Sequence, residues 1–230
     1  MTRGVFVTGT DTGVGKTFVA CAIVHALRAR GLRVAPMKPV AAGAVWRDGA
    51  WANEDTLALA GAAGAGAPSL DAITPLLLRD PMAPHIAAAR EGMPIALAPL
   101  VEAHRRLASQ WDFTVVEGVG GFHVPLGPSL DARDLARALG LPVVLVVGLR
   151  LGCLNHALLT AESIERAGLA FAGWIANAID PRMSAADENV AALAGRLPAP
   201  LIGRLPFTPG ADPRAAAGLL DASALAGPGA

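Results

Sequence analysis

Short apolar runs of strand length alternate with segments whose apolar residues recur at helical spacing, from one end of the chain to the other. The run at 142–147 consists almost entirely of apolar, mostly branched residues, which is typical of a central strand in a parallel sheet. Strands are predicted at 5–7, 33–38, 113–116, 142–147, 172–177 and 201–203. Helices are predicted at 18–30, 53–63, 97–110, 130–139, 155–167 and 185–197, the second of them capped by Asn53.

This alternation predicts an α/β fold with one doubly wound, mainly parallel sheet and helices on both of its faces. The chain has no internal repeat and no linker that would divide it, so residues 1–230 are expected to form a single domain with 227–230 as a frayed tail. In such sheets, ligands bind beyond the carboxyl ends of the strands. The polar residues that end or follow strands should therefore meet in one crevice: Thr17, Lys38, Glu117, Arg150 and Asn177.

Composition limits the range of partners. Lys plus Arg and Asp plus Glu are equal at 19 each, so no net field attracts nucleic acid or an anionic membrane. The N-terminus leaves no room for a signal peptide before the first strand, and the aliphatic run at 141–149 is far shorter than the roughly 20 residues of a membrane helix. We expect a cytoplasmic protein that binds neither nucleic acid nor membrane. The two cysteines and five scattered histidines suggest neither a disulfide framework nor a zinc site.

The segment 9–17, Gly-Thr-Asp-Thr-Gly-Val-Gly-Lys-Thr, stands between the first predicted strand and helix. We call it the phosphate loop, because a Gly-rich turn here directs backbone N–H groups and the positive end of the helix dipole at one place. Lys16 can reach the outer phosphates of a nucleotide, and the Thr17 hydroxyl can bind Mg²⁺. The usual pattern has Gly where Thr10 stands. The segment predicts nucleotide binding; the alternative is a chance Gly-rich helix start.

Phosphoryl transfer also needs a carboxylate for the metal ion and positive charge near the moving group. Glu117 comes directly after a buried strand and Asp55 opens a predicted helix, so both are candidate metal ligands. Each has an alternative role, as a structural strand-end carboxylate or as an acid at a helix N-terminus. Lys38 precedes Pro39 and could bridge an acceptor and the γ-phosphate, or remain a solvated loop lysine.

Several segments together resemble the dethiobiotin synthetase family. Met-Lys-Pro-Val-Ala at 37–41 and Leu-Gly-Cys-Leu-Asn-His at 151–156 are specific to that family, whereas the phosphate loop is shared by many folds. The other resembling segments are 9–17, 53–55, 83–85, 116–121, 172–177 and 203–207, in the family's order. The resemblance implies a P-loop NTPase type of fold, ATP as co-substrate, Mg²⁺, and a homodimer with the substrate site at the subunit interface.

The resemblance also implies a reaction of biotin biosynthesis. 7,8-Diaminopelargonic acid takes up CO₂ as a carbamate, the carbamate attacks the γ-phosphate of ATP to give a carbamic-phosphoric anhydride, and the second amine closes the cyclic urea of dethiobiotin. Lys38 is the implied catalytic lysine, and the implied metal ligands are Thr17, Asp55 and Glu117. The implied ATP contacts are Gly13, Val14, Gly15, Lys16, Thr17, Phe18, Asp55, Glu117, Gly118, Val119, Gly120, Asn177, Pro206, Phe207 and Thr208. The last four of these surround the base.

Substrate contacts are implied for Thr12, Ala42, Arg150, Gly152, Cys153 and Asn155. The last three precede a helix whose N-terminal amides could bind the distal carboxylate of the second subunit's substrate; alternatively, Asn155 is an ordinary helix cap. Two positions depart from the family. Ala42 stands where a hydroxyl residue is common, and Arg150 stands where Lys is frequent. Losing one neutral hydrogen bond at Ala42 would weaken substrate binding by on the order of 1 kcal/mol, unless backbone groups or water take its place.

Three other functions share part of these sequence features. A partitioning ATPase of the ParA/MinD type carries a signature lysine five residues before the phosphate-loop lysine, where this chain has Asp11, and no basic amphipathic tail is visible. A glutamine-amide ligase of the cobyric acid type normally carries a further glutaminase domain, for which 230 residues leave no space. A regulatory nucleotide-binding module without turnover is favoured only by Ala42.

Overall fold

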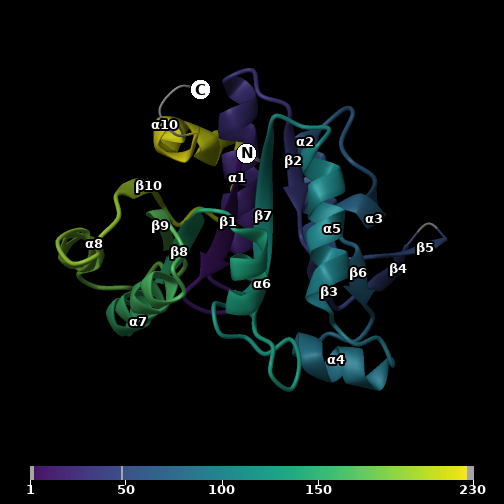
Figure 1. The fold of residues 1–230 in the computed structure, drawn as a ribbon. Coiled ribbons are helices and arrows are strands. Elements are labelled where there is room, and N and C mark those ends of the chain that lie inside the picture. Colours follow the sequence, from purple (N-terminus) through teal and green to yellow (C-terminus); the bar gives the residue numbers. More distant parts are fainter. Residues whose placement is uncertain (1–2, 48, 227–230) are drawn as a thin grey trace.

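A six-stranded parallel sheet forms the centre of the molecule in the computed structural model, which describes residues 3–47 and 49–226 (Figure 1). Its strand order is β10-β9-β8-β1-β7-β2, and each neighbouring pair is parallel. The strands are β1 (Gly4–Gly9), β2 (Val34–Met37), β7 (Phe113–Gly121), β8 (Val143–Leu149), β9 (Phe171–Ala178) and β10 (Leu201–Leu205). The predicted fold class is thereby confirmed.

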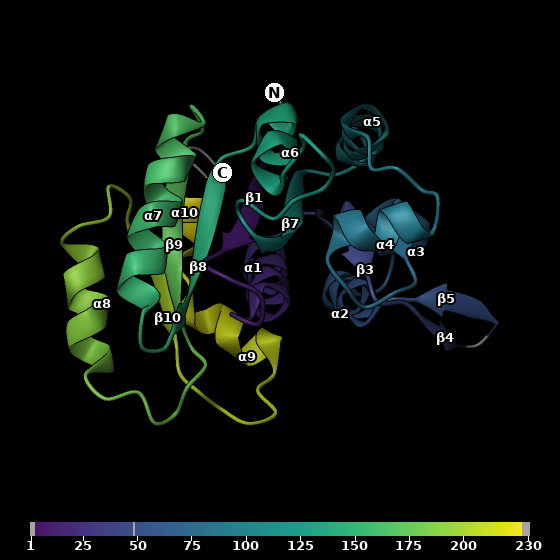
Figure 2. The ribbon, with the colours of Figure 1, turned by 90° about the horizontal axis from the view of Figure 1, so that it is seen from below.

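Helices cover both faces of this sheet (Figures 1 and 2). Along β1, Phe6 points into one hydrophobic core while Val5 and Val7 point into the other, because side chains alternate along a strand. The Phe6 face is covered by α4 (Pro84–Arg90), α5 (Leu97–Ala108), α6 (Ala132–Leu139), α7 (Cys153–Arg166) and α8 (Ala186–Ala194). The Val5 face is covered by α1 (Lys16–Ala29), α2 (Glu54–Ala63), α3 (Leu70–Ile73), α9 (Pro213–Ala216), the 3₁₀ turn η1 (Ala217–Leu219) and α10 (Ala222–Ala226).

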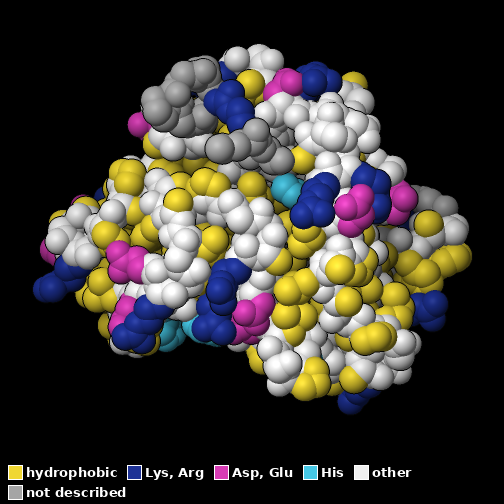
Figure 3. Space-filling view, viewed as in Figure 1, with side chains coloured by type: hydrophobic (Ala, Val, Ile, Leu, Met, Phe, Trp, Pro, Cys, Tyr) yellow, Lys and Arg dark blue, Asp and Glu magenta, His cyan; other side chains and the backbone are white. Residues whose placement is uncertain are grey.

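The segment between β2 and α5 holds short strands that the sequence pattern did not predict. β3 (Val40–Ala42) pairs in parallel with β6 (Leu76–Leu78), and β4 (Val45–Arg47) pairs with β5 (Ala50–Ala52) in an antiparallel hairpin. Three residues are too few to show a period of two, so these strands carry no visible pattern. In Figure 3, apolar side chains gather on the side of the molecule that carries this hairpin and α4.

Several predicted boundaries were wrong in ways that matter for function. β7 continues through Gly121, so Glu117 lies inside a strand rather than after it. α7 begins at Cys153 because Gly152, with a left-handed φ of 94°, allows the chain to turn into the helix two residues before the predicted start. Asn155 therefore lies in the first turn and is not the cap. Asn53 caps α2 as predicted, and its side chain accepts from the backbone of Asp55 and Thr56.

No helix within 3–47 and 49–226 combines the length and apolar character that crossing a membrane requires. The predicted frayed tail at 227–230 lies outside the described residues.

Candidate active site

The carboxyl ends of β1, β7 and β2 bring the phosphate loop, Glu117 and Lys38 together, because these three strands are neighbours in the sheet. A cavity of about 690 Å³ opens there. Predicted site residues that line it are Thr12, Gly13, Gly15, Lys16, Thr17, Lys38, Ala42, Asp55, Glu117, Val119 and Gly120. Of the five polar residues predicted to meet in one crevice, Thr17, Lys38 and Glu117 line this cavity, whereas Arg150 and Asn177 do not.

The phosphate loop depends on glycine and on one contact from β9. Gly13 and Gly15 have φ values of 75° and 85°, in the left-handed region that favours glycine. A Cβ atom added to Gly15 would lie 2.3 Å from Asn177 Nδ2. Asn177 Nδ2 in turn donates to the Val14 carbonyl oxygen at 2.9 Å. The Asn177 side chain therefore holds the backbone of the phosphate loop in place. It also leaves no room for a side chain at position 15.

Lys16 lies in the first turn of α1, with its ammonium inside the cavity. Its Nζ donates to the Asp11 carbonyl oxygen at 2.9 Å. Burial lowers the pKa of Lys16 from its ordinary 10.5 to about 8, although the negative charge of Glu117 opposes this shift. A buried ammonium with one backbone acceptor is well placed to receive an anionic ligand such as a phosphate.

Nucleotide affinity is expected to depend on pH through Lys16. Phosphates favour the ammonium form, so binding above pH 8 must bring a proton to the neutral amine, whereas below pH 8 the proton is already present. Affinity for Mg·ADP should therefore fall above pH 8 by up to about tenfold per pH unit. Isothermal titration in buffers of different ionisation enthalpy measures the proton uptake. Lys16→Arg, whose guanidinium stays charged, should lose this slope; an equal slope in Lys16→Arg would contradict the assignment.

Lys38 lies at the centre of a cluster of predicted metal ligands. Its Nζ is 2.7 Å from Asp55 Oδ2 and 2.7 Å from Glu117 Oε1. The Thr17 hydroxyl donates to the same Glu117 oxygen at 2.9 Å. The side chains of Lys38 and Glu117 are 6% and 1% exposed, and that of Asp55 is 40% exposed. The sequence-predicted lysine and all three metal-ligand candidates thus meet at one point.

The two carboxylates set the protonation of this cluster. Burial alone would lower the pKa of Lys38, but Glu117 and Asp55 outweigh burial and raise it. For Asp55, burial would raise the pKa of the carboxyl, but the Lys38 ammonium outweighs it and holds the pKa below its usual range. Lys38 therefore stays charged well above neutral pH, whereas Lys16 loses its proton near pH 8.

The donor set fits a small divalent cation. Carboxylate and hydroxyl oxygens are the ligands that Mg²⁺ prefers, and Mg²⁺ usually takes one or two carboxylates and completes its shell with phosphate and water. Glu117 Oε2 is buried without a hydrogen-bond partner, so one carboxylate oxygen is available for a cation. Within 3–47 and 49–226, no three His, Cys, Asp or Glu side chains gather to hold a metal, so the ligand set rests on two carboxylates and Thr17.

Removing the Lys38 ammonium should favour cation binding to the free protein, because Nζ stands between the two carboxylates that a cation would use. Lys38→Met is expected to bind Mn²⁺ at least about tenfold more tightly in the absence of nucleotide. Titration followed by the electron paramagnetic resonance of free Mn²⁺ measures this affinity. Lys16→Met removes a charge that is not held between the carboxylates and should have a smaller effect. Unchanged or weaker Mn²⁺ binding by Lys38→Met would show that its ammonium does not compete for this position.

The cavity also has an apolar wall that the sequence analysis did not identify as part of the site. It is formed by Pro81, Met82, Ala83, Pro84 and Val124. Only the resembling segment 83–85 pointed to this region. The wall faces the same cavity as the charged cluster, so the space suits a ligand with a polar end and an aliphatic part.

The remaining predicted residues lie outside the lining of this cavity. Leu205 pairs with Asn177, so Pro206, Phe207 and Thr208 leave the sheet beside the phosphate loop, with Phe207 44% exposed. Gly118 and Phe18 pack within the fold: a Cβ on Gly118 would meet the Phe6 ring at 2.9 Å, and Phe18 packs against the α1 core.

The predicted substrate residues near α7 also stand outside the lining. Gly152 and Asn155 are exposed at the start of α7, whereas Cys153 is buried. Arg150 follows β8 as predicted, but its guanidinium contacts the Asp11 carboxylate of the phosphate loop. The sequence assigned no role to Asp11 beyond its difference from a lysine.

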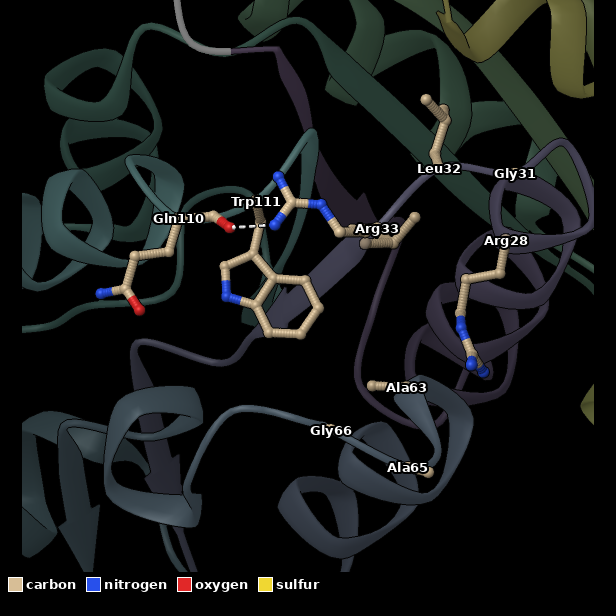
Figure 4. A pocket seen from close by; sticks show the side chains of 10 residues that line it. Arg28, Gly31, Leu32, Arg33, Ala63, Ala65, Gly66, Gln110 and Trp111 are labelled. Atoms are coloured by element: carbon tan, nitrogen blue, oxygen red, sulfur yellow. Dashed lines mark hydrogen bonds between the residues drawn. The ribbon is translucent and has the colours of Figure 1, made fainter.

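A second cavity, of about 530 Å³, opens at the opposite rim (Figure 4). Arg28 donates to the Ala62 carbonyl oxygen at 2.8 Å near the end of α2. Arg33 pairs with Asp112 and donates to the Gln110 carbonyl oxygen at 3.0 Å. Both guanidinium groups are thus engaged in holding the fold, and no predicted site residue lines this cavity.

Two sequence comparisons relate the chain to known proteins. Residues 3–215 match a family described as an AAA domain. Over 211 residues the chain is 57% identical to the ATP-dependent dethiobiotin synthetase BioD of Aromatoleum aromaticum, which covers 92% of this chain and 93% of that protein.

Solved structures share the fold at low sequence identity. The septum site-determining protein MinD of Pyrococcus horikoshii, complexed with Mg-ADP, gives a TM-score of 0.60 at 22% identity and covers 91% of this chain and 83% of its own. A ParA family ATPase of Chlorobium tepidum gives a TM-score of 0.55 at 15% identity, with coverage of 98% and 96%. High identity over nearly the whole of both chains is found with the dethiobiotin synthetase alone among these three proteins. The chain therefore belongs to the ATP-dependent dethiobiotin synthetase family.

Proposed function

We propose that this chain is an ATP-dependent carbon–nitrogen ligase that forms the cyclic urea of dethiobiotin from 7,8-diaminopelargonic acid, CO₂ and ATP, in biotin biosynthesis. The observation that carries the proposal is the Lys38 ammonium, 2.7 Å from both Asp55 and Glu117, in the cavity that the phosphate loop also lines. Such a cavity can hold a triphosphate, a divalent cation and an incoming anion around one fixed positive charge. All of residues 1–230 are taken as one ATP-binding ligase domain.

In this proposal, Lys16 binds the outer phosphates and Lys38 stabilises the charge that is shared by the carbamate and the γ-phosphoryl group. Mg²⁺, held by Thr17, Asp55 and Glu117, supplies charge neutralisation on the phosphates. The carbamate oxygen displaces ADP from the γ-phosphorus, and the second amine then attacks the carbamate carbon and releases phosphate. Each step keeps negative charge near the two lysines, where fixed cations are most effective.

The apolar wall supports an aliphatic substrate. Pro81, Met82 and Val124 can pack along the alkyl chain of the diamine while its amines face Lys38 and Thr12. Ala42, on the same cavity, is assigned to the substrate as well. The adenine is assigned to Asn177 and to the segment 206–208 that follows β10.

We also propose a homodimer. Leu151, Leu158 and Leu159 are 98%, 37% and 56% exposed on and just before α7, beside the exposed Asn155. An apolar surface of this kind is typical of a protein–protein contact. A second copy that covers it would bring Gly152, Cys153 and Asn155 of one subunit toward the substrate of the other. The enzyme is expected to act in the cytoplasm, on small molecules only.

The direct test is incubation of the purified chain with diaminopelargonic acid, bicarbonate and Mg·ATP, with mass detection of dethiobiotin and measurement of ADP. Product and ADP should appear in equal amounts, and ADP release should require the diamine. ADP release independent of the diamine would support a nucleotide-binding ATPase instead. Binding without any turnover would support the regulatory module.

Restoring a hydroxyl at position 42 should tighten substrate binding. Ala42→Ser is expected to lower KM for the diamine by about fivefold, the effect of one neutral hydrogen bond, with little change in kcat. Ala42→Val, which adds bulk without a donor, is the matched control and should not lower KM. An unchanged KM in Ala42→Ser would mean that another group already makes this contact.

A further inference from the structure

An ion pair ties the phosphate loop to the turn that precedes α7. Asp11 lies in the first half of the loop, after β1, and Arg150 comes directly after β8, the neighbour of β1 in the sheet. Arg150 Nη2 contacts Asp11 Oδ2, and the two side chains are 41% and 46% exposed. Neither group takes part in the cluster of Lys38 and its carboxylates.

Each partner also holds its own segment. Asp11 Oδ1 accepts from the Thr12 backbone N–H at 2.7 Å, and the Asp11 carbonyl oxygen accepts from Lys16 Nζ at 2.9 Å. The Arg150 carbonyl oxygen accepts from the N–H of Cys153, the first residue of α7, at 3.0 Å. A continuous line of contacts therefore runs from Lys16 through Asp11 and Arg150 to the start of α7.

We infer that Asp11 and Arg150 are a positioning pair that clamps the phosphate loop in its nucleotide-binding shape against the turn before α7. The inference rests on the proposed function, because it takes the loop to bind a nucleotide. A carboxylate beside a phosphate site is unfavourable by charge alone, since it repels the ligand. The contacts of Asp11 with Thr12 and Arg150 explain why a carboxylate stands here in spite of this repulsion.

One substitution distinguishes a positioning role of Asp11 from the effect of its charge, because the two explanations predict opposite changes in Mg·ADP affinity. Asp11→Asn removes a negative charge near the phosphates but keeps an oxygen that can accept from the Thr12 N–H. If only the field matters, Mg·ADP should bind more tightly; if the pair positions the loop, Asp11→Asn should weaken binding, by on the order of fivefold. Arg150→Ala should weaken it similarly, and Arg150→Lys, which keeps a cation for Asp11, should largely restore it.

The experiment is a double-mutant cycle on Mg·ADP affinity by isothermal titration with the full chain. Because the two side chains act as one unit, Asp11→Asn combined with Arg150→Ala should bind no more weakly than either single variant. The matched control is the exposed pair of Arg33 and Asp112 at the opposite rim, where Arg33→Ala with Asp112→Asn should leave the affinity unchanged.

Two results would overturn the inference: tighter or unchanged binding in Asp11→Asn, or losses that simply add in the double variant. Failure of the unaltered chain to bind Mg·ADP would overturn the proposed function and this inference with it. Wild-type binding combined with tighter binding in Asp11→Asn would overturn the positioning pair alone.

Discussion

Lys38→Ala is expected to lower kcat by about 10²–10³-fold, the usual effect of removing one preorganised hydrogen-bond donor that faces developing negative charge. Affinity for Mg·ADP should not fall, because Lys38 contacts Asp55 and Glu117 rather than the phosphate loop and its removal leaves both carboxylates free for the cation. Steady-state kinetics together with titration of Mg·ADP measures the two quantities separately.

Lys16→Ala is the matched comparison, since it removes the other ammonium of the same cavity. It should weaken Mg·ADP binding as well as turnover, because Lys16 lies in the phosphate loop itself. If Lys38→Ala lost nucleotide affinity to the same extent as Lys16→Ala, the separate roles of the two lysines would be wrong.

Glu117→Gln should affect both folding and turnover. The Glu117 side chain is 1% exposed and pairs with Lys38, which is 6% exposed, so the substitution leaves a buried ammonium without its buried partner. Leaving a buried charge without any partner costs about 3–5 kcal/mol of unfolding free energy, and Asp55 offsets part of this cost because it still contacts the ammonium. The loss of the carboxylate should also abolish Mg²⁺-dependent turnover. Urea unfolding followed by tryptophan fluorescence measures the stability.

Asp55→Asn is the control for Glu117→Gln, because its side chain contacts the same ammonium but is 40% exposed. Water can compensate for part of its loss, so we expect a similar loss of turnover with a clearly smaller loss of stability. If the two variants lost equal unfolding free energy, the burial of Glu117 would not explain its contribution to stability.

The central sheet could be predicted from the sequence because its strands are visible locally. Runs such as 142–147 are apolar throughout, and the helices between strands show their own spacing. The segment between β2 and α5 could not be predicted in this way. There β3 is stabilised by pairing Val40 with Leu76, a contact between residues far apart in the sequence, and three-residue strands have no local signal.

The candidate site likewise has one part that could be predicted from local sequence and another part that could not. The phosphate loop is one contiguous segment, and its glycines, lysine and threonine form a motif that is typical of phosphate binding. It could therefore be identified from the sequence directly. Lys38 and Glu117 lie 79 residues apart, and only the strand order brings them to 2.7 Å. Ligands bind beyond the carboxyl ends of parallel strands, and this rule predicts that both residues lie at one rim of the sheet. No local pattern predicts the ion pair of Asp11 and Arg150, which are 139 residues apart.

The most direct test of the proposed chemistry follows the oxygen atoms of CO₂. Freshly dissolved C¹⁸O₂ is supplied with diaminopelargonic acid and Mg·ATP in unlabelled water, and the reaction is quenched before the label exchanges. Attack of a carbamate oxygen on the γ-phosphorus predicts one ¹⁸O atom in the released phosphate and one in the urea carbonyl of the product. Released phosphate without ¹⁸O would contradict the account, because it would mean that water and not the carbamate takes the phosphoryl group.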